Sequence, residues 1–159
     1  MKKLCTRVLA ASLLLATAAP MALAGDMKTY PAAACVSNDA DIVVDGNAYK
    51  QNNGAGAATL ICPIVRDPSS SLSQVGTVWV TDRHYSENVC CSSRSKNPGG
   101  NALRFTADEC SSGVNGGVAL GFAGPVMAGT WEHRFFRCVL PGTYEGNASE
   151  LLTYRSQEL

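Results

Sequence analysis

The sequence predicts an all-β fold: a two-sheet antiparallel β-sandwich, jelly-roll or immunoglobulin-like, with about seven or eight strands. Three observations predict it. After residue 24 the chain has hardly any helical periodicity, short runs rich in Val, Ile, Thr, Phe and Tyr recur, and Gly, Asn and Pro separate these runs. Many short strands separated by turns are typical of two packed sheets.

The runs define the expected strands, and the segments between them contain residues that favour tight turns. Asn-Gly and Pro-Gly pairs, as at Asn115-Gly116 and Pro141-Gly142, supply the positive or fixed φ that such turns require. In chain order, the expected strands are 42–49, 57–65, 76–82, 88–94, 102–107, 117–123, 131–140 and 150–156.

The first 24 residues have the pattern of a bacterial signal peptide. Basic residues come first, an apolar run covers 8–19, and Ala22-Leu23-Ala24 has the small residues that precede a cleavage site, which we place between Ala24 and Gly25. The run is shorter than the roughly 20 residues of a membrane-spanning helix, so we expect cleavage and no stable membrane insertion. Residues 25–159 have the size of a single domain.

Cleavage would also change the charge balance. The chain has 13 basic and 13 acidic residues, and removal of Lys2, Lys3 and Arg7 would leave a charge of about −3. No segment rich in Lys and Arg follows residue 24. Nucleic acids and anionic membranes attract proteins with clustered positive charge, so we expect neither as a partner.

Six cysteines remain after residue 24, and an even number in an exported chain predicts three disulfides. A metal site is disfavoured because no two of these cysteines have the Cys-x₂₋₄-Cys spacing of metal ligands. A redox site is disfavoured because Cys-x-x-Cys is absent. The cysteines are therefore expected to stabilise the fold, and no cofactor is expected.

Cys90 and Cys91 are adjacent in an expected strand, so their side chains should point to opposite faces and have different partners. Six cysteines allow fifteen pairings, and the sequence leaves the choice open. The favoured hypothesis joins Cys91 to Cys138, Cys90 to Cys110 and Cys35 to Cys62. The main rival contains a Cys62–Cys138 bridge.

Several short strings occur in a fixed order along the chain. They are Cys-Pro-Ile-Val-Arg-Asp at 62–67, Val-Trp-Val-Thr-Asp at 78–82, the strand with Cys91, Phe-Arg-Cys-Val-Leu-Pro at 136–141 and Leu-Thr-Tyr-Arg at 152–155. Together they resemble a loose group of small exported bacterial proteins that have no assigned function. The resemblance implies a β-sandwich with disulfides between strands, and it brings no catalytic, cofactor or metal residue.

Trp79 is the best single candidate for a surface contact. In the strand 77–82 it alternates in phase with Thr77 and Thr81, opposite to Val78 and Val80, so we expect it on the outer face. Other aromatic residues offer a platform for sugar or peptide ligands together with Trp79. They are Tyr30, Tyr49, Tyr85, Trp131, Tyr144 and Tyr154.

Other polar residues suggest chemistry only weakly. Asp82 and His84 with a serine would suit a hydrolase, but Gly-x-Ser-x-Gly is absent, so we favour a solvated loop histidine and name no catalytic residue. His133 lies between Glu132 and Arg134, and we expect it at the polar, exposed start of a strand. The acids at 39, 41 and 45 offer oxygen ligands for calcium without the EF-hand spacing, so exposed turn carboxylates are favoured.

These observations predict an exported, periplasmic or extracellular protein that acts without catalysis, as a small binding or structural module for an unknown protein or carbohydrate ligand. The alternative is a secreted enzyme or enzyme inhibitor that acts through surface loops. An enzyme should show a concave pocket with titratable groups of perturbed pKa, whereas a binding module should show an exposed aromatic patch.

Overall fold

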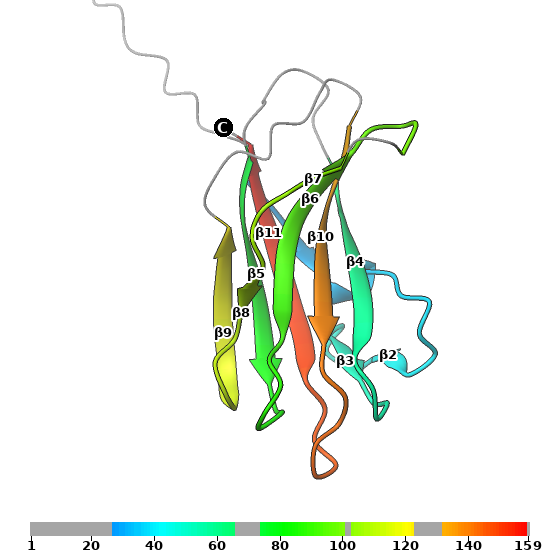
Figure 1. Ribbon diagram of the computed structural model, residues 1–159, viewed down its shortest axis with the longest axis vertical. Helices are drawn as coiled ribbons and strands as arrows, with labels where there is room; N and C mark the ends of the chain where they lie inside the picture. The colour runs from blue at the N-terminus through cyan, green and yellow to red at the C-terminus, as the bar shows by residue number, and fades with distance from the viewer. Residues whose placement is uncertain (1–26, 66–73, 101–102, 123–131, 159) are drawn as a thin grey trace, which may run out of the picture.

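The computed structural model describes residues 27–65, 74–100, 103–122 and 132–158, which form two antiparallel sheets packed face to face (Figure 1). The described part contains eleven strands and one 3₁₀ turn, η1 (Ala32–Ala34). The strands are β1 (Met27–Pro31), β2 (Ile42–Val44), β3 (Lys50–Asn52), β4 (Ala58–Ile64), β5 (Gln74–Asp82), β6 (Cys90–Lys96), β7 (Leu103–Phe105), β8 (Glu109–Cys110), β9 (Asn115–Phe122), β10 (His133–Leu140) and β11 (Glu150–Glu158).

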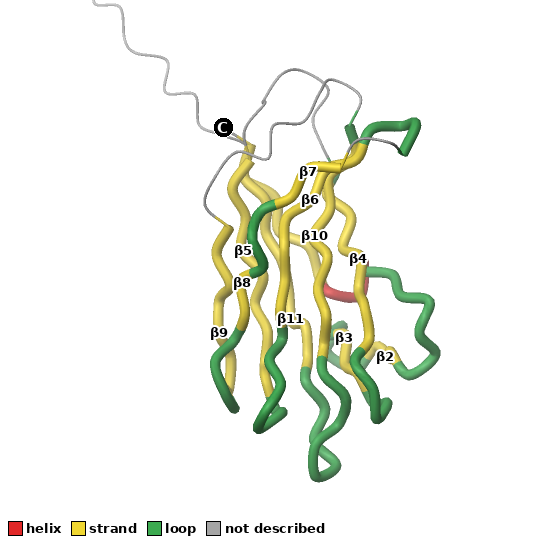
Figure 2. The backbone as a smooth tube through the Cα atoms, viewed as in Figure 1, coloured by secondary structure: helices red, strands yellow, loops and turns green. Residues whose placement is uncertain are grey.

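The six-stranded sheet has the order β2-β3-β11-β5-β9, and β1 also pairs with β11. The five-stranded sheet has the order β4-β10-β6-β7, and β8 also pairs with β6. The loops that join β5 to β6 and β10 to β11 lie at the same end of the sandwich (Figure 2). Within the described residues, no helix has the length and apolar character needed to cross a bilayer.

The core lies between the sheets and follows the two-residue period of the strands. In β4 the side chains of Ala58, Leu60, Cys62 and Ile64 are buried, and those between them are more exposed. Phe136 of β10 packs against Phe122 and Tyr154, with ring centres 5.3 and 5.9 Å away. Gly76 of β5 makes room for this ring, because a Cβ there would lie 2.3 Å from Cζ of Phe136.

The predicted fold class is confirmed, but the expected strand 42–49 is wrong. This segment and its continuation form a hairpin of β2 and β3, because the Asp45 carboxylate accepts hydrogen bonds from the backbone N–H groups of Asn47 and Tyr49, both at 2.9 Å, and closes a turn. Strands β1 and β8 are not among the strands expected from the sequence. The predicted signal peptide and its cleavage site lie outside the described residues.

The structure has three disulfides: Cys35–Cys62, Cys90–Cys110 and Cys91–Cys138. These are the pairs of the favoured hypothesis. Each bond joins directly opposed positions of antiparallel segments, with the two Cα atoms 4.1 Å apart. Cys91 is fully buried and Cys90 is half-buried, as expected for adjacent residues on opposite faces.

Tyr154 makes the stability of the fold decrease at alkaline pH. The ring is fully buried, and its hydroxyl donates a hydrogen bond to the Pro63 carbonyl at 2.7 Å. Burial, and then the neighbouring Tyr30, raise the pKa of Tyr154 well above its ordinary value. Above the ordinary phenol pKa of about 10, the unfolded chain loses this proton while the folded chain keeps it, so stability falls as pH rises.

We therefore expect Tyr154→Phe to lower the free energy of unfolding by about 1 kcal/mol at pH 7, through the lost hydrogen bond. The variant should also lose less stability than the wild type between about pH 9 and 11. Urea unfolding at both pH values measures the two effects. Tyr85→Phe is the control, because Tyr85 is 75% exposed. An equally steep alkaline loss in Tyr154→Phe would contradict the assignment.

Candidate functional site

A groove with a volume of about 430 Å³ lies on the outer face of the six-stranded sheet. Strands β1, β5 and β11 contribute most of its walls. Its lining residues are Thr29, Tyr49, Trp79, Leu152, Thr153 and Arg155. We call this groove the Trp79 groove.

The register of the sheet places these side chains together. Trp79 of β5 lies opposite Thr153 of β11, while Arg155 lies opposite Thr77 of β5 and Thr29 of β1. Val78 and Val80 are fully buried, so the pleat turns Trp79 outward, where it is half-buried. Residues 29, 79 and 155 thus meet on one face although they are far apart in the sequence.

Trp79 has different neighbours on its two sides. On the β11 side, the guanidinium carbon of Arg155 lies 5.3 Å from the centre of the indole ring, within range of a cation–π contact. On the β9 side, the residue opposite Trp79 is Ala119 and the residue opposite Thr77 is Gly121, and both are exposed. Strand β9 therefore adds little side-chain bulk beside the ring.

The polar groups of the groove are suited to binding. Among the described residues, the Arg155 guanidinium has no hydrogen bond or ion pair with another protein group, so its N–H donors are available to a ligand. The Thr153 hydroxyl already donates a hydrogen bond to the Tyr30 carbonyl at 2.7 Å, so its proton is not available to a ligand. The lining residues include no carboxylate and no imidazole, the groups that most often transfer protons in enzymes.

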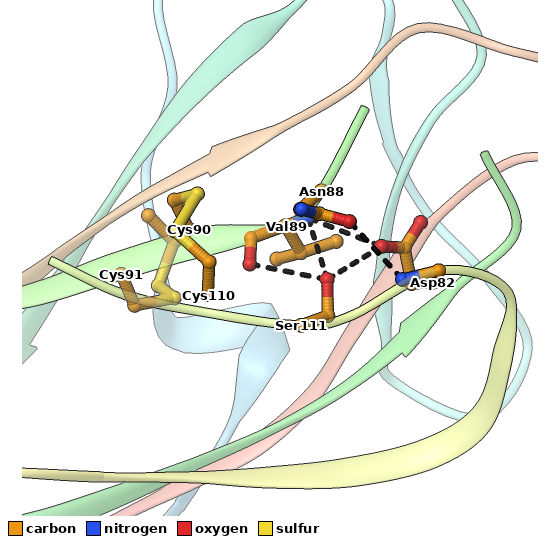
Figure 3. The surroundings of a disulfide bond; sticks show 9 residues. Asp82, Asn88, Val89, Cys90, Cys91, Cys110 and Ser111 are labelled. Carbon is orange, nitrogen blue, oxygen red and sulfur yellow. Dashed lines mark hydrogen bonds between the residues drawn. A yellow bond between two sulfur atoms is a disulfide. The ribbon is translucent and has the colours of Figure 1, made fainter. Parts of the chain in front are cut away.

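Asp82 lies in the core and does not open onto the Trp79 groove. Its buried carboxylate accepts hydrogen bonds from the Ser111 hydroxyl and the Val89 backbone N–H (Figure 3). It also accepts hydrogen bonds from the Ser149 hydroxyl and the His84 backbone N–H. The Ser111 hydroxyl also accepts a hydrogen bond from the Val89 N–H at 2.9 Å. The carboxylate thereby connects the loop after β5 with the segments that follow β8 and precede β11.

The structure does not place the His84 side chain on this carboxylate. Nδ1 of His84 accepts hydrogen bonds from the backbone N–H groups of Ser86 and Glu87, at 3.3 and 2.9 Å, and its ring meets the edge of Tyr144. The Ser/His/Asp arrangement considered from the sequence is therefore not assembled through His84. His133 is exposed on β10, on the outer face of the other sheet.

The acids considered for calcium act within turns. The Asp39 carboxylate accepts a hydrogen bond from the backbone N–H of Asp41 at 3.0 Å, and Asp45 closes the hairpin described above. No group of three or more His, Cys, Asp or Glu side chains converges on a metal-sized site in the part of the chain that the structure describes.

The aromatic residues considered as a platform lie in three places. Trp79 and Tyr49 share the groove, and Tyr30 stacks on the buried Tyr154 with ring centres 4.9 Å apart. Tyr85 and Tyr144 lie in the loops at one end of the sandwich, with ring centres 6.3 Å apart. Trp131 lies outside the described residues.

The groove also contains four residues that the sequence did not indicate as candidates: Thr29, Leu152, Thr153 and Arg155. The only local signal for Arg155 is its alternation with Tyr154, which points inward. The pairing of β11 with β1 and β5, which brings these residues to Trp79, has no local signal.

No protein-family model and no curated protein matches this sequence. Several solved structures have a similar fold. The xylan-binding module CBM15 matches with a TM-score of 0.53 and 6% identity, over 84% of this chain and 97% of the module. The C-terminal CBM6 of the marine laminarinase LamC from Zobellia galactanivorans matches with a TM-score of 0.50 and 13% identity, over 84% of this chain and 100% of that module.

A family two carbohydrate esterase from Cellvibrio japonicus is also similar, with a TM-score of 0.51 and 10% identity over 85% of this chain. The match covers 34% of the esterase chain, so this protein corresponds to about a third of that enzyme. At these identities, the comparisons show that this chain shares the β-sandwich fold of the two carbohydrate-binding modules and of part of the esterase.

Proposed function

We propose that this protein is a non-enzymatic module that binds carbohydrate through the Trp79 groove. The observation that carries the proposal is an outward-facing Trp79 beside Arg155, whose donors have no acceptor among the described residues. The apolar face of a sugar ring packs against an aromatic ring, and its hydroxyls accept hydrogen bonds from a guanidinium. Ligand sites commonly combine apolar or aromatic surface with a few polar groups in this way.

Two further observations support the proposal. The similar structures include a module named as xylan-binding and a carbohydrate-binding module of a laminarinase, so a sandwich of this kind serves carbohydrate binding in other proteins. Three disulfides are typical of proteins in oxidising compartments. Together with the predicted signal peptide, they favour export to the periplasm or the medium, where polysaccharides are accessible.

The proposal predicts that Trp79→Ala weakens binding to a neutral polysaccharide about 30-fold, as expected when a central tryptophan is removed from a binding site. The protein should first be tested by affinity electrophoresis against xylan, laminarin, mannan, galactan and cellulose. Calorimetry with oligosaccharides of the best ligand then compares the wild type with Trp79→Ala.

Tyr85→Ala is the matched control, because it removes an exposed aromatic ring at the loop end of the sandwich, away from the groove. Its affinity should equal that of the wild type. Failure of the wild type to bind any of these polysaccharides, or equal binding by Trp79→Ala, would refute the proposal. Release of reducing sugars from the bound polymer would instead favour the alternative of a secreted enzyme.

A further inference from the structure

The outer face of the five-stranded sheet carries two arginines on neighbouring strands. Arg94 of β6 lies directly opposite Phe135 of β10, and Arg137 lies two residues further along β10, opposite Ser92. The arginines are therefore diagonal neighbours on one face. Diagonal pairs on adjacent strands lie about 7–8 Å apart, within reach of long side chains. We call this surface the arginine face.

Within the described residues, both arginines are hydrogen-bonded to hydroxyl groups and not to carboxylates. Nε of Arg94 donates to the Ser92 hydroxyl at 3.0 Å, and Nη2 of Arg137 donates to the Thr59 hydroxyl at 3.4 Å. Among the described residues, no ion pair joins either guanidinium to a carboxylate. Each guanidinium is thus oriented by a neutral hydroxyl and keeps further N–H donors for a ligand.

The electrostatic surroundings of Arg94 favour an added negative charge. Burial is the main factor that lowers the pKa of Arg94, and the charge of Arg137 lowers it further, while Asp108 acts in the opposite direction. The two positive charges therefore repel each other across the diagonal between β6 and β10. An anionic group bound between the two guanidiniums would offset both their mutual repulsion and their desolvation.

Apolar side chains flank the two arginines on both sides. The Arg94 guanidinium carbon lies 5.7 Å from the ring centre of Phe105, which is 65% exposed. On the other side of Arg137, the opposed residue is Ile61, which lines two grooves of about 560 and 470 Å³. The face therefore combines apolar groups with the two guanidiniums, while Lys96 and His133 lie at one end of it and Asp39 and Glu132 line the grooves.

We propose that the arginine face is a second binding site, which binds an acidic polysaccharide through Arg94 and Arg137. An acidic sugar chain combines apolar ring faces with carboxylate or sulfate groups, and so it matches both the apolar groups and the guanidinium donors. A nucleic acid fits less well, since its binding depends on many phosphate contacts. Two clustered arginines supply few such contacts. Residues 25–159 also carry a net charge of about −3, which does not favour binding of a nucleic acid. This site does not depend on the Trp79 groove.

The test uses calorimetry on the protein that begins at Gly25, with two pairs of probes. Polygalacturonate oligomers are compared with their methyl esters, and dextran sulfate is compared with dextran. We expect binding to at least one acidic member and none to its uncharged counterpart, and the acidic member that binds identifies carboxylate or sulfate as the recognised group. Binding should weaken about tenfold in each of the single variants Arg94→Gln and Arg137→Gln.

Arg83→Gln is the matched control, because it removes one exposed positive charge from the loop after β5, away from this face. Its affinity and that of Trp79→Ala should equal the wild-type value, which separates this site from the Trp79 groove. Thermal melting establishes that the variants fold. If an arginine variant does not fold, the wild type alone still tests the proposal, because binding should weaken about tenfold in 0.5 M NaCl.

Several results would overturn the proposal. They are equal binding of the methyl ester and the free acid, an equal loss in Arg83→Gln, and no binding to either acidic probe. A DNA oligomer that binds as tightly as the acidic sugar would also overturn it, in favour of a nucleic-acid ligand.

Discussion

Replacing Cys91 and Cys138 together with alanine is expected to lower the free energy of unfolding by about 4 kcal/mol. The two cysteines are 47 residues apart, and their bond restricts the unfolded chain more than a short loop would. Both side chains are also fully buried between the sheets, so their truncation removes core contacts. Chemical denaturation of the purified variant measures the loss.

The double variant Cys90→Ala/Cys110→Ala is the matched control. Its bond closes a loop of only 20 residues, and Cys110 is exposed, so we expect a smaller loss of about 3 kcal/mol. An equal or larger loss in this control would contradict the argument from loop length and burial. A stabilising role for all three bonds also requires that reduction of the wild type lowers its melting temperature.

Asp82→Ala is expected to lower the free energy of unfolding by about 3 kcal/mol. The substitution removes a fully buried acceptor from four donors, two of which are backbone N–H groups, and the second hydrogen bonds between Val89 and Ser111 replace only part of what is lost. Buried donors without partners cost more than the original hydrogen bonds contributed. Urea unfolding at neutral pH is the measurement.

Asp41→Ala is the control for a lost aspartate, because Asp41 is exposed, and we expect a change within about 0.5 kcal/mol. Ser149→Ala removes only one of the four donors and should cost about 1 kcal/mol. If Asp82→Ala were no more damaging than Ser149→Ala, the carboxylate would not be the group that holds these loops together.

The fold class was predictable because strand periodicity is a local property. The alternation of Val78 and Val80 with Trp79 already separates the inner and outer faces of β5, and the adjacent Cys90 and Cys91 require partners on two sides of one strand. Both arguments need only neighbouring residues and the geometry of an extended chain.

The short strands β3 and β8 were not predictable because tertiary contacts define them. Strand β3 contains only Lys50, Gln51 and Asn52, which have no hydrophobic alternation. Asn52 is nevertheless fully buried, since its side-chain amide donates to the carbonyls of Gly56, Leu140 and Pro141. From the sequence alone, a polar residue such as Asn52 is expected to be exposed, because its hydrogen-bond partners are distant in the chain.

The candidate sites were predictable only in part, for the same reason. The phase of β5 indicated that Trp79 faces outward, but the neighbours that turn it into a groove come from β1 and β11. The arginine face likewise depends on the register between β6 and β10, which determines that Arg94 and Arg137 are neighbours. Strand pairing between distant segments has no signature within either segment.

The three disulfides have two different roles. Cys90–Cys110 and Cys91–Cys138 join strands within the five-stranded sheet, whereas Cys35–Cys62 joins β4 of that sheet to the segment that directly follows β1 and η1, and β1 belongs to the six-stranded sheet. Two bonds therefore hold one sheet together, and the third links the chain of one sheet to the other. When packing between the sheets weakens, we expect the β1 end of the six-stranded sheet to stay close to β4.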